Sequence, residues 1–282
     1  MNDQTPRPIS SLTTRLSRPA ERLRSFVWCY GQNSGVVRGS PIVLPLPARP
    51  KNVLTFFFAS GPARSLVHGP QSYQQVQISL IGSVDNFTIH FQPSGLYRLF
   101  GVPMREFADA SHDAEGILGQ IAISLRGRLG EAVSFAERVR LTDSLLLELV
   151  DSAWSGDPVG AAANHVFAAH GKVRVGAMAA ACNLSVRQFE RRFQANTGLP
   201  PKLYARITRF NAAVYRKLCR PDSSWADIAV DCGFSDQMHL VRDFREFAGD
   251  TPARFEARLR LAPELRSMFA TADLVSAPQS SG

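Results

Sequence analysis

Two expected helices, over residues 185–196 and 235–247, carry guanidinium, amide and carboxylate side chains along one face. In the major groove of DNA, Arg pairs with guanine, Gln with adenine, and Glu with the amino group of cytosine. The residue types therefore predict recognition of base edges, with an ordinary solvated face as the alternative. The side chains are Arg187, Glu190, Arg191 and Gln194 in the first helix, and Gln237, His239, Arg242 and Arg245 in the second.

The opposite face of each helix is apolar. Phe189 and Phe193 lie four residues apart in the first helix, as do Leu240 and Phe244 in the second, so each pair faces one side. A short expected helix precedes each of these helices and is separated from it by a tight bend. This order is the helix-turn-helix pattern, whose second helix enters the major groove.

The two units are copies of each other. "MAAACNLS" (178–185) aligns with "IAVDCGFS" (228–235) at an offset of 50 residues, and beyond the two serines the offset becomes 51. A period near 50 over such a span indicates the duplication of one structural unit. Ser185 and Ser235 are the expected N-caps of the two recognition helices.

One helix, expected over residues 201–219, joins the two units. Nineteen residues at ~1.5 Å each give about 28 Å, which with the flanking bends approaches the ~34 Å pitch of B-DNA. A rigid connector of this length would set the recognition helices into successive major grooves. We expect phosphate contacts at the helix starts and along the connector, with plain surface charge as the alternative. The side chains are Ser185, Ser235, Arg206, Arg209, Arg216, Lys217 and Arg245.

The positive charge of the chain is concentrated in this region. The 282 residues carry a formal net charge of +8, and residues 171–260 hold 16 Lys and Arg against 9 Asp and Glu. Only 4 of the 32 basic residues are Lys, and the planar guanidinium of Arg suits bidentate contact with bases and phosphates. The pattern predicts a nucleic-acid-binding module. No apolar run approaches the roughly 20 residues that a membrane-spanning helix needs, so no membrane partner is expected.

The first half of the chain is typical of β-structure. Five runs rich in β-branched and aromatic residues are separated by Gly, Pro, Asn and Asp, as in "GQNSG" and "PARPKN", which predicts short strands joined by turns. The runs are "FVWCY", "SPIVLPLP", "NVLTFFFA", "VQISLI" and "NFTIHFQ". So many short strands favour a barrel or a sandwich, and we expect a cupin-like β-barrel. "QPSGLYRLFG" follows them as a loop or turn.

The fold class is therefore α+β in two domains, with "SGDPVG" (155–160) at the boundary. Two helices, over 114–129 and 131–152, trail the barrel and either pack on it or pair with a second subunit. The expected organisation is a flexible arm (1–24), a sensor or dimerisation domain (25–155), an all-α DNA-binding domain (156–260) and a disordered tail (261–282). The seven helices expected in the third part lie over 158–170, 174–181, 185–196, 201–219, 224–232, 235–247 and 251–260.

The barrel aromatics have two interpretations, an apolar ligand pocket or a plain core. The pocket candidates are Phe56, Phe58, Tyr73, Phe87 and Phe91. His68, His90 and His112 lack the spacing of a metal site, so neither a metal nor another cofactor is expected. Cys29, the one cysteine outside the helical region, supports an alternative function, an enzyme or a DNA-repair protein with a reactive thiol.

The C-terminal region, from about Pro158 to Leu259, resembles the DNA-binding domain of the AraC/XylS family of transcription regulators. The resemblance rests on "LSVRQFERRFQANTGLPPKLYARITRFNAAVYRKL" and "WADIAVDCGFSDQMHLVRDFREFAGDTPARF". It implies a non-enzymatic regulator that binds promoter or operator DNA and meets RNA polymerase there. It also implies, in the N-terminal half, a sensor for a small-molecule effector and helices that form a homodimer. The four widely scattered cysteines independently predict reduced, mostly buried thiols in a cytoplasm. The effector, the operator and the direction of control stay open.

The resemblance also assigns base-reading positions. These are Arg187, Glu190 and Arg191 in the first recognition helix, and Gln237, Met238, His239 and Arg242 in the second. Three residues depart from the family pattern: Asn183 replaces a common Gly, and Met238 and Leu240 replace a frequent Ser and Phe. Met238 therefore leaves the base preference of the second helix open. An architectural protein without sequence preference is a third interpretation, against which the polar faces argue.

Overall fold

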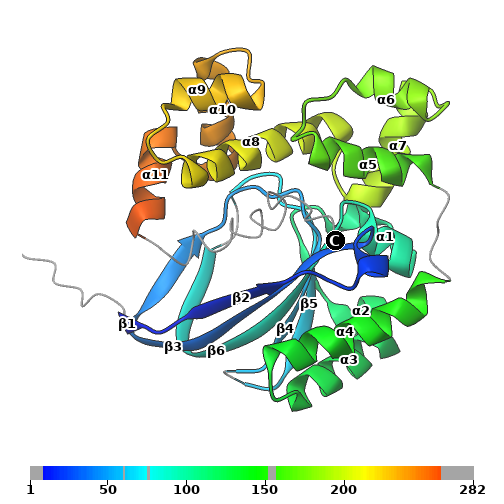
Figure 1. Cartoon of the computed structure of the whole chain (residues 1–282), viewed down its shortest axis with the longest axis vertical. Helices are drawn as coiled ribbons and strands as arrows, with labels where there is room; N and C mark the ends of the chain where they lie inside the picture. Colours follow the sequence, from blue (N-terminus) through cyan, green and yellow to red (C-terminus); the bar gives the residue numbers. More distant parts are fainter. Residues whose placement is uncertain (1–8, 60, 75–76, 152–156, 262–282) are drawn as a thin grey trace, which may run out of the picture.

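The computed structural model describes residues 9–59, 61–74, 77–151 and 157–261. The N-terminal half is an antiparallel sheet covered by helices, and the described residues from 157 onward are helical (Figure 1). The predicted two-domain α+β class is therefore confirmed. No helix in the described ranges combines the length and the hydropathy that crossing a bilayer requires.

Seven strands form one antiparallel sheet in the order β1-β3-β6-β4-β5-β7, with β2 also paired to β3. The strands are β1 (Ile9–Ser10), β2 (Thr13–Ser17), β3 (Val27–Pro45), β4 (Val53–Phe57), β5 (Arg64–His68), β6 (Gln77–Phe91) and β7 (Ser111–Asp113). The sheet curls around a cavity of about 980 Å³, which residues of β2, β5 and β7 all line.

Two strands are longer than the sequence predicts. The runs at 26–30 and 40–47 merge into β3, and those at 76–81 and 86–92 merge into β6, its antiparallel partner. Residues that the sequence indicates as turns therefore lie inside these two paired strands. Gly39, at φ 81°, lies where the register of the pairing shifts, between Val37 and Ile42. Hydrogen bonds to a distant strand overrode the local turn preference, which is how sheet context commonly acts.

The helices of the N-terminal half are α1 (Gly95–Phe100), α2 (Ala114–Leu118), α3 (Gln120–Glu131) and α4 (Phe135–Val150), with 3-10 turns η1 (Glu21–Leu23) and η2 (Met104–Phe107). The loop expected at "QPSGLYRLFG" is thus helical. The first of the two trailing helices is divided because Gly119, at φ 58°, ends α2. Arg138 of α4 is anchored to the sheet by two hydrogen bonds to the carboxylate of Asp85, at 2.6 and 2.8 Å.

The flexible arm predicted for residues 1–24 is wrong for its described part. β1 and β2 both pair with β3, and the backbone N–H of Ala20 donates to Asp143 of α4 at 3.1 Å. Polar composition concealed these strands because an edge strand exposes most of its side chains, as β2 does. Residues 1–8 of the arm, and the tail from 262 onward, lie outside the described residues.

The C-terminal helices follow the sequence pattern closely. They are α5 (Pro158–Ala168), α6 (Val175–Ala181), α7 (Val186–Thr197), α8 (Pro201–Cys219), α9 (Trp225–Cys232), α10 (Gln237–Ala248) and α11 (Pro252–Leu261). The connector α8 carries α5–α7 at one end and α9–α11 at the other, and the sheet lies beneath it (Figure 1).

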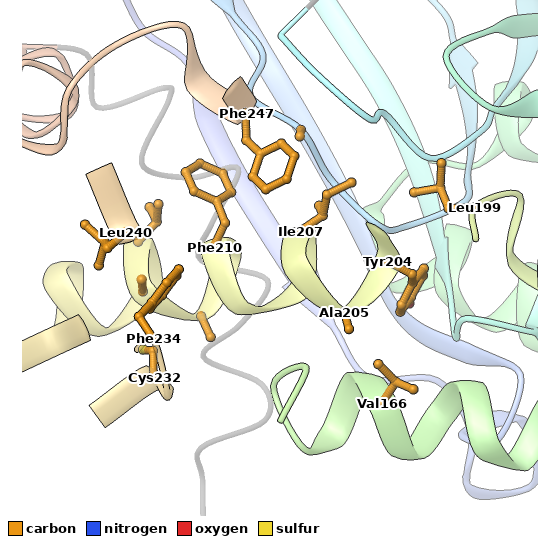
Figure 2. Close-up of a cluster of buried hydrophobic side chains, with 14 of the residues drawn as sticks. Val166, Leu199, Tyr204, Ala205, Ile207, Phe210, Cys232, Phe234, Leu240 and Phe247 are labelled. Atoms are coloured by element: carbon orange, nitrogen blue, oxygen red, sulfur yellow. The ribbon is translucent and has the colours of Figure 1, made fainter. Parts of the chain in front are cut away.

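The core of this half forms along α8. Phe210 packs edge-on against Phe244 and Phe247, with ring centroids 4.9 and 5.7 Å apart, and Figure 2 shows Phe247 directly beside it. The core continues into the N-terminal half, because the backbone N–H of Ala48 donates to the carbonyl of Phe247 at 2.8 Å and Asn211 of α8 donates to the Ala48 carbonyl at 2.9 Å. The two halves are therefore packed together through α8 and α10.

Candidate nucleic-acid interface

The first helix-turn-helix unit consists of α6 and α7. Asn183 takes a left-handed conformation, at φ 54°, in the bend between them, which Asn tolerates better than most residues. Ser185 then caps α7: its hydroxyl accepts from the N–H of Gln188, and the Gln188 side chain accepts from the N–H of Ser185. This capping box satisfies backbone donors that the helix itself leaves unpaired, and so fixes where the recognition helix begins.

Removal of this cap is expected to destabilise the chain measurably. Ser185→Ala deletes the oxygen that accepts from Gln188, and loss of an N-cap costs roughly 1 kcal/mol of unfolding free energy. Urea unfolding followed by circular dichroism measures the change. Ser185→Thr is the control, because Thr also caps helices, and equal stability of the Ala and Thr variants would contradict the role.

The second unit consists of α9 and α10, and its bend contains Gly233 at φ 75°. The N-cap predicted at Ser235 is wrong, because Asp236 caps α10 and accepts from the N–H of His239 at 2.7 Å. Helix starts are hard to place from sequence when two capping residues are adjacent. Ser235 instead lies beside the cap, with its hydroxyl 3.1 Å from both Asp236 and the ring of His239.

The predicted division of each recognition helix into two faces is present in the structure. Phe189, Phe193, Leu240 and Phe244 are fully buried, so they hold α7 and α10 to the core. Six of the seven base-reading candidates are exposed, and His239 is half-buried against the ring of Phe234. The exposed six are Arg187, Glu190, Arg191, Gln237, Met238 and Arg242. Both polar faces are thus accessible from solvent.

Several of the phosphate-contact candidates make internal contacts instead. Lys217 is 8% exposed, and its ammonium donates to the carbonyls of Pro221 and Ser223 at 2.7 and 2.8 Å. It stabilises the turn between α8 and α9. A phosphate contact by Lys217 is therefore not favoured, because its ammonium is already used inside the protein. Arg216 lies 2.9 Å from the carboxylate of Asp231.

Arg206 of α8 has a similar internal role. Its guanidinium is 2.6 Å from both the buried Asp243 and Glu246 of α10. The hydrogen bond with Glu246, followed by that with Asp243, raises the pKa of Arg206 above its usual value. The residue joins the connector to the second recognition helix, so the phosphate contact predicted for it is not favoured. These ion pairs form because α8 packs against α10, and the spacing of residues in the sequence does not reveal that contact.

Arg209 is half-buried and donates to the carbonyl of Gly171 at 3.3 Å, with its guanidinium over the ring of Phe234. Arg245 and the two serines, by contrast, are exposed. The phosphate contacts that stay as predictions are therefore those of Ser185, Ser235 and Arg245.

Of the two interpretations of the barrel aromatics, a ligand pocket or a plain core, their burial favours the core. Phe56, Phe87 and Phe91 are fully buried in the core between the sheet and the N-terminal helices. Phe58 packs against the same core and under the guanidinium of Arg138, whereas Tyr73 is 44% exposed. Strand alternation explains the burial of Phe56, Phe87 and Phe91, because their rings point to the covered face of the sheet and the cavity of about 980 Å³ lies on the other face.

Cys29 does not have the properties of a reactive thiol. It is fully buried, and burial raises the pKa of its thiol to about 11, an effect that nearby Lys51 only partly offsets. A nucleophilic cysteine needs a lowered pKa and access to its substrate. The alternative based on this residue has no support from its surroundings.

A second cavity, which sequence reasoning missed, lies between the two halves of the chain. It has a volume of about 740 Å³ and is lined by residues of β3, β6, α5 and α8. Arg49 and Lys51 line it, from the segment "PARPKN" that the sequence indicates only as a turn. No local pattern could have identified them, because the opposite wall is supplied by helices more than 100 residues later.

Comparison with known proteins agrees with this description. A family model described as a helix-turn-helix domain matches residues 178–258, and one described as a domain of unknown function (DUF6597) matches residues 16–113. No curated protein is significantly similar to the chain.

Solved structures provide further relatives. The DNA-binding domain of AdpA, a global transcriptional factor crystallised with a target DNA, is 31% identical over 39% of this chain and 98% of its own, with a TM-score of 0.35. ToxT from Vibrio cholerae O395 is 9% identical over 87% of this chain and 97% of its own, with a TM-score of 0.40. With two helix-turn-helix units joined by one helix, and that degree of identity to AdpA over the whole of its DNA-binding domain, the chain belongs to the AraC/XylS family of transcription regulators.

Proposed function

We propose that this DNA-binding regulator reads a specific, asymmetric site, with α7 and α10 entering successive major grooves. The observation that carries the proposal is the pair of exposed polar faces at opposite ends of α8, a helix of 19 residues. At ~1.5 Å per residue this helix is about 28 Å long, close to one turn of B-DNA with its flanking bends. Two different sets of side chains at the two ends would recognise two different base sequences.

The assignment of base contacts follows from side-chain type and exposure. Arg187, Arg191 and Arg242 offer forks that match the acceptor edge of guanine, and Gln237 offers an amide that matches adenine. Met238 is 65% exposed, and its apolar side chain suits contact with a thymine methyl group. The DNA-binding domain of AdpA, 31% identical over this region, was crystallised with its target DNA, which supports duplex DNA as the ligand.

Selection from a random pool of duplexes tests the proposal. The full chain is expected to enrich one asymmetric motif with two conserved boxes about 10 base pairs apart, the spacing of one helical turn. Arg191→Ala should relax preference in one box, and Arg242→Ala in the other. Enrichment of no motif would favour an architectural protein, and a motif with a single box would contradict reading by two recognition helices.

Affinity for the selected site is expected to fall steeply with salt. Each phosphate that a basic side chain neutralises contributes about −0.9 to the slope of log K against log salt concentration. Arg245→Gln should therefore lower the absolute slope by about 1 and weaken binding to all sequences alike. Fluorescence anisotropy between 50 and 200 mM salt gives the slope. Lys217→Met should leave the slope unchanged. A smaller slope in Lys217→Met and an unchanged slope in Arg245→Gln would contradict the assignment of the phosphate contact to Arg245.

The remaining parts of the proposal concern the N-terminal half. We infer that a small-molecule effector acts through it, because the curled sheet encloses a cavity of about 980 Å³. Homodimerisation through α3 and α4, and contact with RNA polymerase at promoters, belong to the same proposal. Exposed Ile123 and Val133, at the start and just beyond the end of α3, are consistent with a partner surface there.

A further inference from the structure

A carboxylate is buried beneath the second recognition helix. Asp243 of α10 is fully buried, as are Leu240 and Phe244 on the core side of the same helix. Taking an ionised carboxylate out of water is unfavourable unless charges and hydrogen bonds compensate it. At the equivalent position of the first unit, 51 residues earlier, α7 carries Arg192, which is exposed. The repeated helix-turn-helix unit therefore does not require a buried charge at this position, which points to a role specific to α10.

The connector α8 holds this carboxylate through Arg206. The guanidinium lies 2.6 Å from Oδ1 of Asp243 and 2.6 Å from the carboxylate of Glu246, so it grips one full turn of α10. It also lies over the ring of Phe247, 4.9 Å from the centroid. The second oxygen of Asp243 is buried with no hydrogen-bond partner in the described residues. Because a buried acceptor without a partner is unfavourable, stability alone does not account for this carboxylate.

His239, one turn before Asp243, is held by the same unit. Its Nε2 lies 4.0 Å from Oδ1 of Asp243, and its Nδ1 lies 3.1 Å from the hydroxyl of Ser235 in the bend. The ring packs edge-on against Phe234, with centroids 5.6 Å apart, and the backbone N–H of His239 donates to the cap Asp236 at 2.7 Å. Both ring nitrogens therefore face groups of the protein, and the ring links the bend to the buried carboxylate.

We propose that Asp243 is a positioning residue for base reading: with Arg206 and His239 it fixes the orientation of α10 on α8. None of the three contacts a base. Their sequence neighbours Met238 and Arg242 do so, from a helix whose rotation on the core is set by the three. This role rests on the proposed function and deepens it, because it removes His239 from the base-reading residues and gives Arg206 and Asp243 a part in specificity.

The physical reason lies in the difference between apolar and ionic contacts. Apolar cores tolerate small shifts and lose their unique geometry before they lose stability, so the packing of Leu240 and Phe244 alone would leave α10 some freedom. A buried, hydrogen-bonded ion pair is favourable only in good geometry. Functional side chains need to be held within about 0.5 Å of their working position by such supporting contacts.

A positioning residue and a base-reading residue affect DNA recognition differently. Discrimination is the ratio of the affinities for the selected duplex and for a duplex with one base pair changed. Loss of a base-reading side chain removes discrimination at the base pair that it contacts. Loss of a positioning residue misplaces every side chain of α10, so discrimination should fall at several base pairs of one box. That box is the one whose preference Arg242→Ala relaxes.

The decisive variant exchanges the ion pair for apolar side chains, Arg206→Met with Asp243→Leu. Such an exchange is often neutral or stabilising, so the variant should unfold in urea like the parent. Discrimination, measured by fluorescence anisotropy, should fall at least about five-fold at several base pairs of the α10 box, because one base contact contributes that much or more. It should stay unchanged in the α7 box. A folded variant that discriminates like the parent in both boxes would overturn the proposal.

Two further variants serve as control and as substitute. Arg126 and Glu115 of the N-terminal half form an ion pair of the same length, 2.6 Å, and Arg126→Met with Glu115→Leu should discriminate like the parent in both boxes. Asp243→Asn keeps the shape of the side chain without its charge and takes the place of the double variant if that chain does not fold. It should show the same loss, spread over the α10 box, and full discrimination in its place would overturn the proposal.

His239→Ala tests the third member of the network. Its loss of discrimination should also spread over several base pairs of the α10 box, because the link between the bend and Asp243 is removed. A loss confined to one base pair would assign His239 to base reading and overturn its positioning role.

A measurement without DNA separates this role from the reading of DNA. Hydrogen exchange followed by mass spectrometry reports the local opening of helices in the free chain. In Arg206→Met with Asp243→Leu, exchange should be faster than in the parent for peptides from α10 and unchanged for peptides from α7. Unchanged exchange in α10 would overturn the positioning role whether or not the parent selects a DNA motif. A parent that selects no motif, with faster exchange in α10 of the variant, would contradict the proposed function alone.

Discussion

The chain with both Arg191→Ala and Arg242→Ala is expected to bind its selected DNA site roughly 2–6 kcal/mol more weakly than the parent. Each Arg is exposed on a different recognition helix, and a bidentate contact with a base contributes roughly 1–3 kcal/mol of discrimination. The two sites share no partner and lie at opposite ends of α8, so their effects should add. Fluorescence anisotropy at one fixed salt concentration measures the loss.

The control must remove the same charge from elsewhere. Arg105 and Arg128 are exposed in the N-terminal half, and the double change of both to Ala lowers the net charge equally. That variant should retain most of the affinity for the selected site. The Arg191/Arg242 variant should lose far less affinity for random duplex than for the selected site. Equal losses on both kinds of DNA would assign the two Arg residues to phosphates and contradict base reading.

Phe210→Ala is expected to lower the free energy of unfolding by roughly 3–5 kcal/mol, the usual cost of deleting a buried aromatic ring. Phe210 is fully buried in the middle of α8, and its ring contacts those of Phe244 and Phe255. It also contacts the ring of Phe247 (Figure 2). The substitution removes packing contacts at the point where α8 meets α10 and α11. Denaturant unfolding followed by tryptophan fluorescence measures it, since Trp225 packs on Phe244 at 4.9 Å.

Val230→Ala is the matched control for this variant, because Val230 belongs to the same unit and is 76% exposed. Its stability should stay within about 0.5 kcal/mol of the parent, as is usual for surface changes. Phe210→Ala should also bind DNA more weakly at temperatures where it is still folded, if α10 loses its support. Full affinity in a folded Phe210→Ala chain would contradict the role of this cluster in positioning the second recognition helix.

The helical half could be predicted from the sequence because its signals are local. Period-3.6 apolar patterns, Gly198 and Gly233 in left-handed conformations, and the Ser185 cap all act within a few residues of the chain. The seven helices accordingly lie where the pattern places them. The N-cap of α10 was predicted one residue too early, at Ser235. The cap is Asp236, a residue type that caps helices equally well.

For the N-terminal half, the sequence predicts that a sheet forms but not the lengths of its strands or which segments join it. The lengths of β3 and β6, and the inclusion of β1 and β2, depend on hydrogen bonds between residues up to 64 positions apart. Aromatic residues such as Phe87 were recognisable as apolar, but which face of the sheet helices α2–α4 would cover was not. The sequence therefore left both interpretations of these aromatics, pocket and core, open.

The duplicated units, their polar and apolar faces and the helix that joins them are all predictable from the sequence, because helix formation and the family motif depend on near neighbours. Which basic side chains remain accessible depends instead on how distant elements pack against one another. Arg206 is drawn to Asp243 of α10 and Lys217 is buried in a turn, while Lys51 meets Phe167 across the two halves. Electrostatic and packing partners of this kind come from distant parts of the chain, and folding alone brings them within contact distance.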